Sequence, residues 1–130
     1  MSKAARALVI AGGVILIAYG AVFLVAPQML GRLVGLEFVR PDAYAEVRAF
    51  YGGLELGIGA FLLYGGVKVG HARSALLLCG FAFAAAGLAR AAGIAQYGCT
   101  DASQPVVAAL EVAYATAALL LTRRGLAGRD

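Results

Sequence analysis

Four stretches of about 20 apolar residues make up most of this chain and constrain its fold more than any other feature. They cover residues 8–26, 44–64, 72–94 and 104–122. A helix of about 20 apolar residues crosses the hydrocarbon core of a bilayer. Because lipid cannot hydrogen-bond open backbone groups, each stretch should be helical. The sequence therefore predicts an all-α fold, an integral membrane four-helix bundle that forms a single domain over residues 1–130.

The composition agrees with this fold class. The chain is 62% hydrophobic and only 14% charged, whereas soluble domains carry about 25% charged residues. Between the first two stretches, Pro27, Gly31 and Gly35 predict that the first helix ends and that a polar loop follows over residues 32–42. Pro41 and Asp42 then give a start signal for the second helix.

Basic residues predict the orientation of the spans. On a four-pass path, one side collects Lys3, Arg6, Lys68, Arg73, Arg123, Arg124 and Arg129, whereas the other side offers only Arg32 and Arg40. Cytoplasmic loops carry the excess of Lys and Arg, so both termini are expected in the cytoplasm. The net charge of +4 is then a topology signal with weak attraction to anionic lipid, and no nucleic-acid partner is expected. The alternative, a cleaved signal peptide over the first apolar run, would leave three helices.

Cysteine and histidine give no sign of a metal or cofactor. Cys79 and Cys99 are separated by roughly 30 Å if the segment between them is a straight helix, which is too far for a disulfide. The chain has no C-x-x-C motif and no His, Cys or carboxylate spacing typical of metal sites. We therefore expect no metal and no cofactor, and we expect His71 to be an interfacial residue.

Ionisable residues within the apolar stretches point to the candidate site. They are Glu46, Arg48, Glu55, Arg90 and Glu111. A charge at the centre of a membrane helix costs roughly 2.5–3.5 kcal/mol, so each of them needs a partner, a water-filled cavity or a function. With α-helical spacing, Arg48, Gly52, Glu55 and Gly59 form one stripe, with Tyr51 beside it and Glu46 on another face.

The predicted site lies in the outer half of the bundle, with Glu55 near the midplane. Side chains lean toward the N-terminus of their helix, so Arg90 leans inward while Glu55 and Glu111 lean outward. Arg90 is therefore expected to be the central residue, pairing with both carboxylates. The predicted binding or ion-pair residues are Arg48, Tyr51, Glu55, Arg90 and Glu111, with Tyr19, Gly52 and Gly59 as neighbours.

A weak internal repeat suggests two similar halves. Arg32-Leu-Val-Gly-Leu recurs as Arg90-Ala-Ala-Gly-Ile, and Leu54-Glu55-Leu-Gly-Ile echoes Leu110-Glu111-Val-Ala-Tyr. Two parallel in-out-in hairpin repeats would place a ligand where the halves meet. Chance similarity in a chain rich in Ala, Gly and Leu is the alternative.

Three features carry a resemblance to a known family. They are the run Glu46-Val-Arg-Ala-Phe-Tyr-Gly-Gly-Leu-Glu55, the later Ala89-Arg90-Ala-Ala-Gly93, and Glu111 in the last stretch. The chain resembles a family of small bacterial four-helix membrane proteins of unknown function, which is distantly DoxX-like. The resemblance implies a bundle in the bacterial cytoplasmic (inner) membrane. It brings no established reaction, although some DoxX-like relatives are subunits of quinone-linked oxidoreductases.

Three functional hypotheses follow. In the first, the charged cluster binds a small amphiphilic or lipid-like molecule, with the head group on the charges and the tail between helices. In the second, the charges are a helix-pairing staple, and the protein is an accessory or structural subunit of a larger membrane complex or a homo-oligomer. In the third, Glu55 is a general acid or base in a quinone-linked or isomerase-type enzyme, for which no nucleophile or cofactor motif is found.

Overall fold

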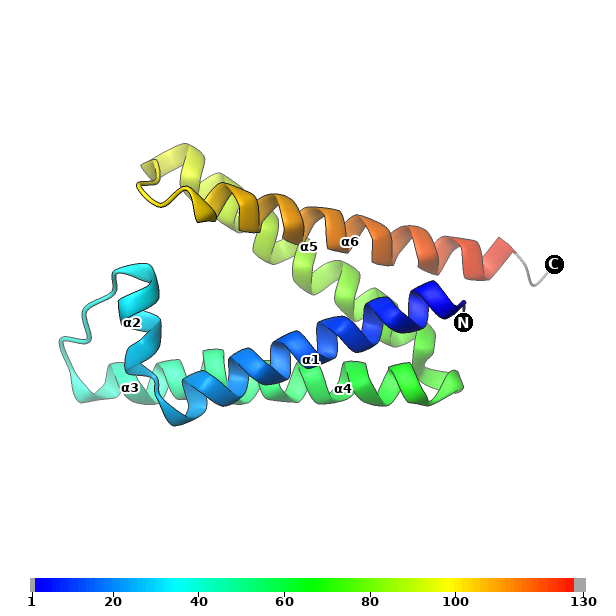
Figure 1. Ribbon diagram of the computed structural model, residues 1–130, viewed down its shortest axis with the longest axis horizontal. Coiled ribbons are helices and arrows are strands. Elements are labelled where there is room, and N and C mark those ends of the chain that lie inside the picture. The colour runs from blue at the N-terminus through cyan, green and yellow to red at the C-terminus, as the bar shows by residue number, and fades with distance from the viewer. Residues whose placement is uncertain (1, 128–130) are drawn as a thin grey trace. The chain divides into compact units, whose positions relative to one another are not determined.

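The computed structural model describes residues 2–127, which form helices joined by short connections, with no strand in that range (Figure 1). In chain order the elements are α1 (Lys3–Val25), α2 (Gln28–Val34), α3 (Pro41–Val47), the π-helix η1 (Arg48–Leu54), α4 (Glu55–Val67), the 3₁₀-helix η2 (Val69–His71), α5 (Ala72–Tyr97) and α6 (Ser103–Ala127). Arg129, one of the basic residues that predict the orientation, lies outside the described residues.

Four helical stretches are long and apolar enough to cross a membrane. They are Lys3–Val25, Pro41–Val67, Ala72–Tyr97 and Ser103–Arg123, and the second consists of α3, η1 and α4 end to end. The predicted all-α fold is confirmed, and the chain is a small multi-pass membrane protein. The helices extend past the apolar stretches because polar and basic residues such as Lys3 can continue a helix into the membrane surface.

The predicted loop over residues 32–42 is wrong in its first part, because α2 continues to Val34. Proline is tolerated where a helix begins, since the first backbone N–H groups have no intrahelical partner, and Pro27 stands at the N-cap of α2. The helix ends at Gly35, which has φ 73° and ψ 31°. Glycine adopts this left-handed conformation without the penalty of a Cβ atom.

A π-helical segment, η1, interrupts the second span. It covers Arg48–Leu54 and therefore includes Arg48, Tyr51 and Gly52 of the predicted site. A π-helix has i→i+5 hydrogen bonds and a wider turn than an α-helix, and such segments are frequent at functional sites. Sequence spacing based on 3.6 residues per turn does not carry through it.

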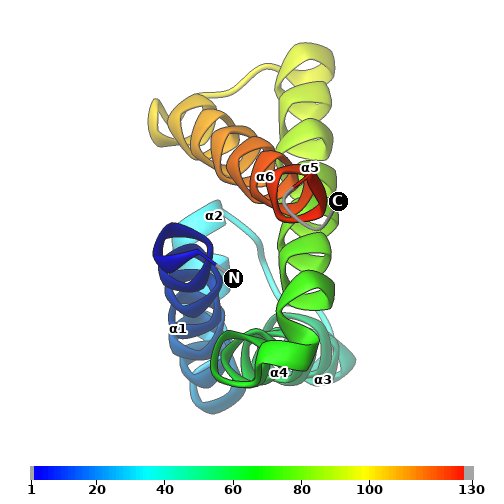
Figure 2. The ribbon, with the colours of Figure 1, turned by 90° about the vertical axis from the view of Figure 1, so that its right-hand side faces the viewer.

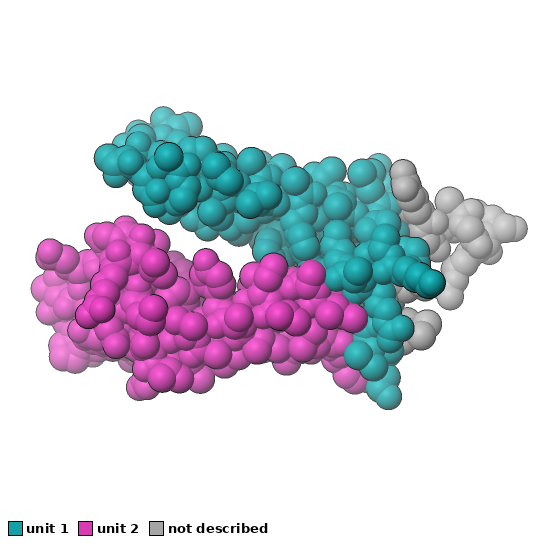
Figure 3. Space-filling model, in the orientation of Figure 1, with its two compact units in different colours: residues 1–9, 65–130 teal, residues 10–64 magenta. Residues whose placement is uncertain are grey.

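The chain divides into two compact units, which Figure 3 colours separately. Unit 1 contains Met1–Val9 and Gly65–Asp130, and unit 2 contains Ile10–Tyr64. Each unit holds one of the two helical hairpins, and each is described by itself below.

In unit 2, α1 and α4 pack through glycine. A Cβ atom at Gly59 would lie 2.8 Å from the carbonyl oxygen of Gly13, and one at Gly20 would lie 2.8 Å from that of Gly52. Gly13 meets Gly59 and the later Gly20 meets the earlier Gly52, so the residue numbers run in opposite directions along the two helices. The two helices are therefore antiparallel. Small residues at such contacts allow backbones to approach closely, which is a common means of helix association in membranes.

In unit 1, α5 packs against α6, and the two helices cross at an angle (Figure 2). A Cβ atom at Gly80 would lie 2.5 Å from the side chain of Leu119, so Leu119 packs directly over this glycine. Asp101 accepts hydrogen bonds from the backbone N–H and the hydroxyl of Ser103 at the start of α6, at 2.9 and 2.7 Å. These bonds lower the pKa of the Asp101 carboxyl below its ordinary value.

Candidate functional site

Arg90 of α5 forms a bidentate ion pair with Glu111 of α6. Its Nε and Nη2 donate to Oε2 and Oε1 of Glu111 at 3.0 and 2.9 Å, and its Nη1 donates to Oε1 of Gln104 at 2.8 Å. The side chains are 34% and 15% exposed for Arg90 and Glu111. This bidentate geometry is the strong form of an arginine–carboxylate pair.

Local packing explains why this pair forms. Gln104 and Glu111 are seven residues apart, which places them on one face of α6. Gly87, about one turn before Arg90 on α5, lets α6 approach: a Cβ atom there would lie 3.0 Å from Cβ of Glu111 and 3.1 Å from the carbonyl oxygen of Ala108. The guanidinium therefore reaches both partners across a close helix contact.

Arg48 of η1 binds main chain instead of a carboxylate. Its Nε donates to the carbonyl oxygen of Leu24 at 2.8 Å. Leu24 lies in the last turn of α1, where backbone carbonyls run out of intrahelical donors. A positive charge at the C-terminal end of a helix is also favoured by the helix dipole.

Glu55 is the first residue of α4, directly after the π-helix. Its Oε2 atom is buried and has no hydrogen-bond partner among the described residues. Most buried polar atoms in proteins have a partner, so an exception calls for a specific explanation.

Three aromatic rings line α1 and η1 in the same unit. Tyr19 meets Phe23 edge-on at 5.7 Å between ring centroids, and Phe23 meets Tyr51 edge-on at 6.3 Å. Phe23 is buried, whereas Tyr19 and Tyr51 are 55% and 45% exposed. Phe23 was missed as a site residue, although its place four residues after Tyr19 could have indicated it.

The predicted site residues are thus divided between the two units. Unit 1 brings Arg90 and Glu111 together and adds Gln104, which was not among the predicted site residues. Unit 2 holds Arg48, Tyr51, Glu55 and the predicted neighbours Tyr19, Gly52 and Gly59. Gly52 and Gly59 both face α1. Leu56, which lies between them in the sequence, also contacts α1, at Gly20.

Within unit 1, polar contacts that the sequence did not predict hold the N-terminal end of α1. The hydroxyl of Tyr114 donates to the carbonyl oxygen of Leu8 and lies 3.9 Å from Sγ of the buried Cys79. Arg6 also donates from Nε to the carbonyl oxygen of Gly66, at 2.9 Å. Cys99 is exposed in the loop after α5. Among the described residues, no three His, Cys, Asp or Glu side chains gather as metal ligands would.

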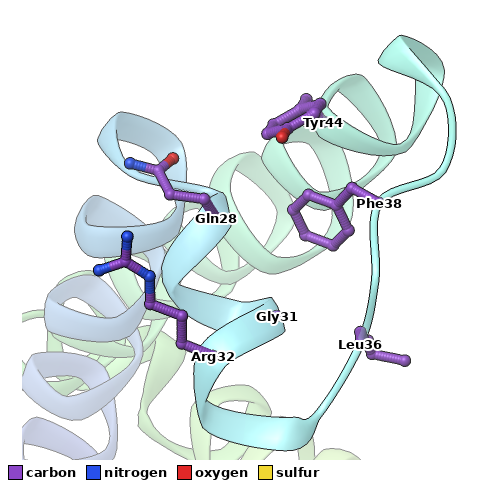
Figure 4. Close-up of a pocket in the computed structure, with 6 residues that line it drawn as sticks. All are labelled: Gln28, Gly31, Arg32, Leu36, Phe38 and Tyr44. Carbon is purple, nitrogen blue, oxygen red and sulfur yellow. The ribbon is translucent and has the colours of Figure 1, made fainter.

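A second candidate is an open pocket of about 260 Å³ in unit 2 (Figure 4). Its lining residues come from α2, the following loop and α3: Gln28, Gly31, Arg32, Leu36, Phe38 and Tyr44. None of these residues was predicted as a site residue from the sequence, because the pocket depends on how the loop folds back on α2.

Fold and site define the class of protein: a small multi-pass membrane protein with charged side chains inside its spans. The chain belongs to the family described as a domain of unknown function (DUF4345), whose model matches residues 4–122. No curated protein and no solved structure matches the chain. The expected membership of a family of unknown function is confirmed.

Proposed function

We propose that the protein binds a small amphiphilic or lipid-like molecule in unit 2, with the head group at Glu55. The observation that carries the proposal is the buried Oε2 atom of Glu55, which has no hydrogen-bond partner among the described residues. An unsatisfied buried polar group costs about 1–3 kcal/mol, so a ligand that donates a hydrogen bond to it would recover that free energy.

The neighbouring groups support a ligand with an ammonium or hydroxyl head group. Arg48, the arginine of the predicted site in unit 2, already donates to Leu24. A carboxylate near aromatic rings suits a cationic or hydroxylated group, because ring faces attract cations and the carboxylate accepts hydrogen bonds. Tyr19 and Tyr51 supply such rings, each more than a third exposed.

The test compares two matched substitutions of glutamate by leucine. Glu55→Leu removes the acceptor, while Glu46→Leu changes an exposed glutamate of α3 in the same unit. Each variant is extracted with its surrounding lipid, and the small molecules retained are measured by native mass spectrometry. We expect wild type and Glu46→Leu to retain the same amphiphile and Glu55→Leu to lose at least nine-tenths of it.

Thermal melting of the same samples after delipidation separates a binding residue from a structural one. Glu55→Leu should melt at or above the wild-type temperature, because the unpaired oxygen is gone. Equal retention of all bound molecules by Glu55→Leu and wild type would exclude Glu55 as the head-group site. Glu55→Gln, which keeps an acceptor, should retain a hydroxylated ligand and lose an ammonium ligand.

The second candidate function is an accessory or structural subunit of a larger membrane complex, or a homo-oligomer. The closed Arg90, Glu111 and Gln104 cluster favours it, because a fully paired cluster suits a helix-pairing staple. Co-purification of the wild-type protein with a larger complex from its native membrane would support this function. The quinone-linked or isomerase-type alternative has no such specific observation in its favour.

The proposal also covers the membrane in which the protein lies, the side on which its termini lie, and its distant relation to other proteins. The distribution of basic residues supports both termini in the cytoplasm. The resemblance of the run from Glu46 to Glu55 supports a bacterial cytoplasmic membrane and a distant relation to DoxX-like proteins.

A further inference from the structure

The pocket beside α2 lies at one end of unit 2, between the first two membrane spans. Residues 26–40 connect the spans Lys3–Val25 and Pro41–Val67, so the pocket is at a membrane face. The exposed apolar side chains around it are Met29, Leu33, Val34, Leu36 and Val39. A short segment that exposes so many apolar side chains between two spans is suited to the boundary between head groups and acyl chains.

Arg32 gives the pocket a positive charge, and its side chain forms no ion pair with a described carboxylate. Gln28 and Arg32 are four residues apart, and Figure 4 shows both side chains leaving α2 on the same side. Arg40, in the same connection, is instead paired with Asp42 at 2.6 Å. A guanidinium and a side-chain amide side by side can donate several hydrogen bonds to one anionic group.

An aromatic wall stands opposite α2. Phe38 and Tyr44 meet edge-on with ring centroids 4.8 Å apart (Figure 4). The loop is fixed against the helix at Gly31: its carbonyl accepts a hydrogen bond from the N–H of Leu36 at 3.0 Å, and a Cβ atom there would lie 2.6 Å from the carbonyl oxygen of Leu36. The pocket therefore depends on glycine at this position.

We propose that this pocket binds an anionic phosphate group, with the guanidinium of Arg32 and the amide of Gln28 as donors. At about 260 Å³ the pocket is smaller than the 300–1,000 Å³ typical of sites for drug-sized ligands, so it suits a head group whose tails stay outside. Phe38 and Tyr44 would pack against the glycerol stem. The phosphate could belong to a membrane phospholipid or be free in solution.

The test measures binding to the full chain in a maltoside detergent by calorimetry. The probes are short-chain phosphatidylglycerol, inorganic phosphate and a short-chain diacylglycerol that lacks the phosphate. All titrations use the Glu55→Leu background, so that a hydroxylated lipid bound at Glu55 does not contribute. In this background we expect Arg32→Gln to weaken binding of phosphatidylglycerol at least tenfold and diacylglycerol not to bind. Arg40→Gln, which removes one positive charge from the same connection, should change Kd less than twofold.

Each outcome decides the proposal. Equal weakening by Arg32→Gln and Arg40→Gln would indicate diffuse surface charge and overturn it, as would binding of diacylglycerol equal to that of phosphatidylglycerol. Inorganic phosphate that binds as tightly as the lipid would identify free phosphate as the source, and binding of the lipid alone would identify a phospholipid. Arg32 is exposed, so the variant should fold, and its melting temperature is measured alongside. Because the Glu55 acceptor is absent from every sample, loss of binding in this test reports on the Arg32 pocket alone and leaves the proposed function at Glu55 untouched.

Discussion

At the scale of single residues, the ionisable groups of the predicted site have three different environments. Arg90 shares its charge with Glu111 and takes a neutral acceptor, Gln104. Arg48 uses a main-chain carbonyl at a helix end. Glu55 has a buried oxygen without a described partner. Because a charge in hydrocarbon is costly, the difference between these environments matters more than the number of charges.

The first prediction at this scale concerns Arg90→Ala. The substitution strands the carboxylate of Glu111, and breaking a buried ion pair costs about 3–5 kcal/mol. Because the Arg90 side chain is 34% exposed, we expect a loss near the lower end of that range, about 3 kcal/mol in the free energy of unfolding. Arg73→Ala, an exposed residue of the same helix, is the control and should change it by less than about 0.5 kcal/mol. Denaturation in mixed micelles measures both.

The double variant Arg90→Met with Glu111→Gln distinguishes a staple from a binding group. If the pair is structural, removing both charges should restore stability to within about 1 kcal/mol of wild type, because a buried pair can often be replaced by neutral residues of similar volume. It should also leave the amphiphile bound at Glu55 in place. A double variant as unstable as Arg90→Ala would contradict the pairing, and a stable one that loses the amphiphile would extend the binding site to Arg90.

At the scale of elements, the second span shows what sequence periodicity could and could not predict. Helical spacing placed Gly52 and Gly59 on one stripe, and both residues face α1. The π-helix at Arg48–Leu54 was not predicted. A shift from i→i+4 to i→i+5 bonding keeps the same apolar composition, so hydropathy carries no signal for it. The prediction that Arg48 and Glu55 share one helix face assumed an unbroken α-helix between them, whereas residues 48–54 are π-helical.

The prediction at this scale uses two glycines of α4. Gly59→Ala would place a Cβ atom 2.8 Å from the carbonyl oxygen of Gly13, which is backbone and cannot rotate away. Such overpacking costs about 1–3 kcal/mol. Gly57→Ala is the matched control, since a Cβ atom there meets nothing within 4 Å. It should stabilise α4 by about 0.5–1 kcal/mol, the usual gain for Gly→Ala in a helix interior.

The free energy of unfolding, measured in mixed micelles, should therefore fall for Gly59→Ala and rise for Gly57→Ala. Destabilisation of equal size in both would show that α4 needs glycine for another reason than its contact with α1.

At the scale of the whole molecule, hydropathy predicted the all-α fold and the four spans because the bilayer leaves the backbone no alternative. The direction in which helical side chains lean pointed from Arg90 to Glu111, which the structure pairs. The pocket at Arg32 was missed, since it depends on the backbone bond between Leu36 and Gly31 and on a ring contact between Phe38 and Tyr44. Contacts of this kind leave no periodic trace in the sequence.

The last prediction fixes the orientation of the spans with two positions in unit 1. Lys68 and Cys99 are both exposed, and the single span α5 separates them, so they belong to opposite faces of the membrane. Because the excess of basic residues lies on the side of Lys68, that side is expected to be cytoplasmic. In intact cells an impermeant maleimide should label native Cys99. It should not label Lys68→Cys in a Cys99→Ser background until the membrane is opened. Labelling of Lys68→Cys from outside, with Cys99 shielded, would invert the topology and place the Arg32 pocket at the cytoplasmic face.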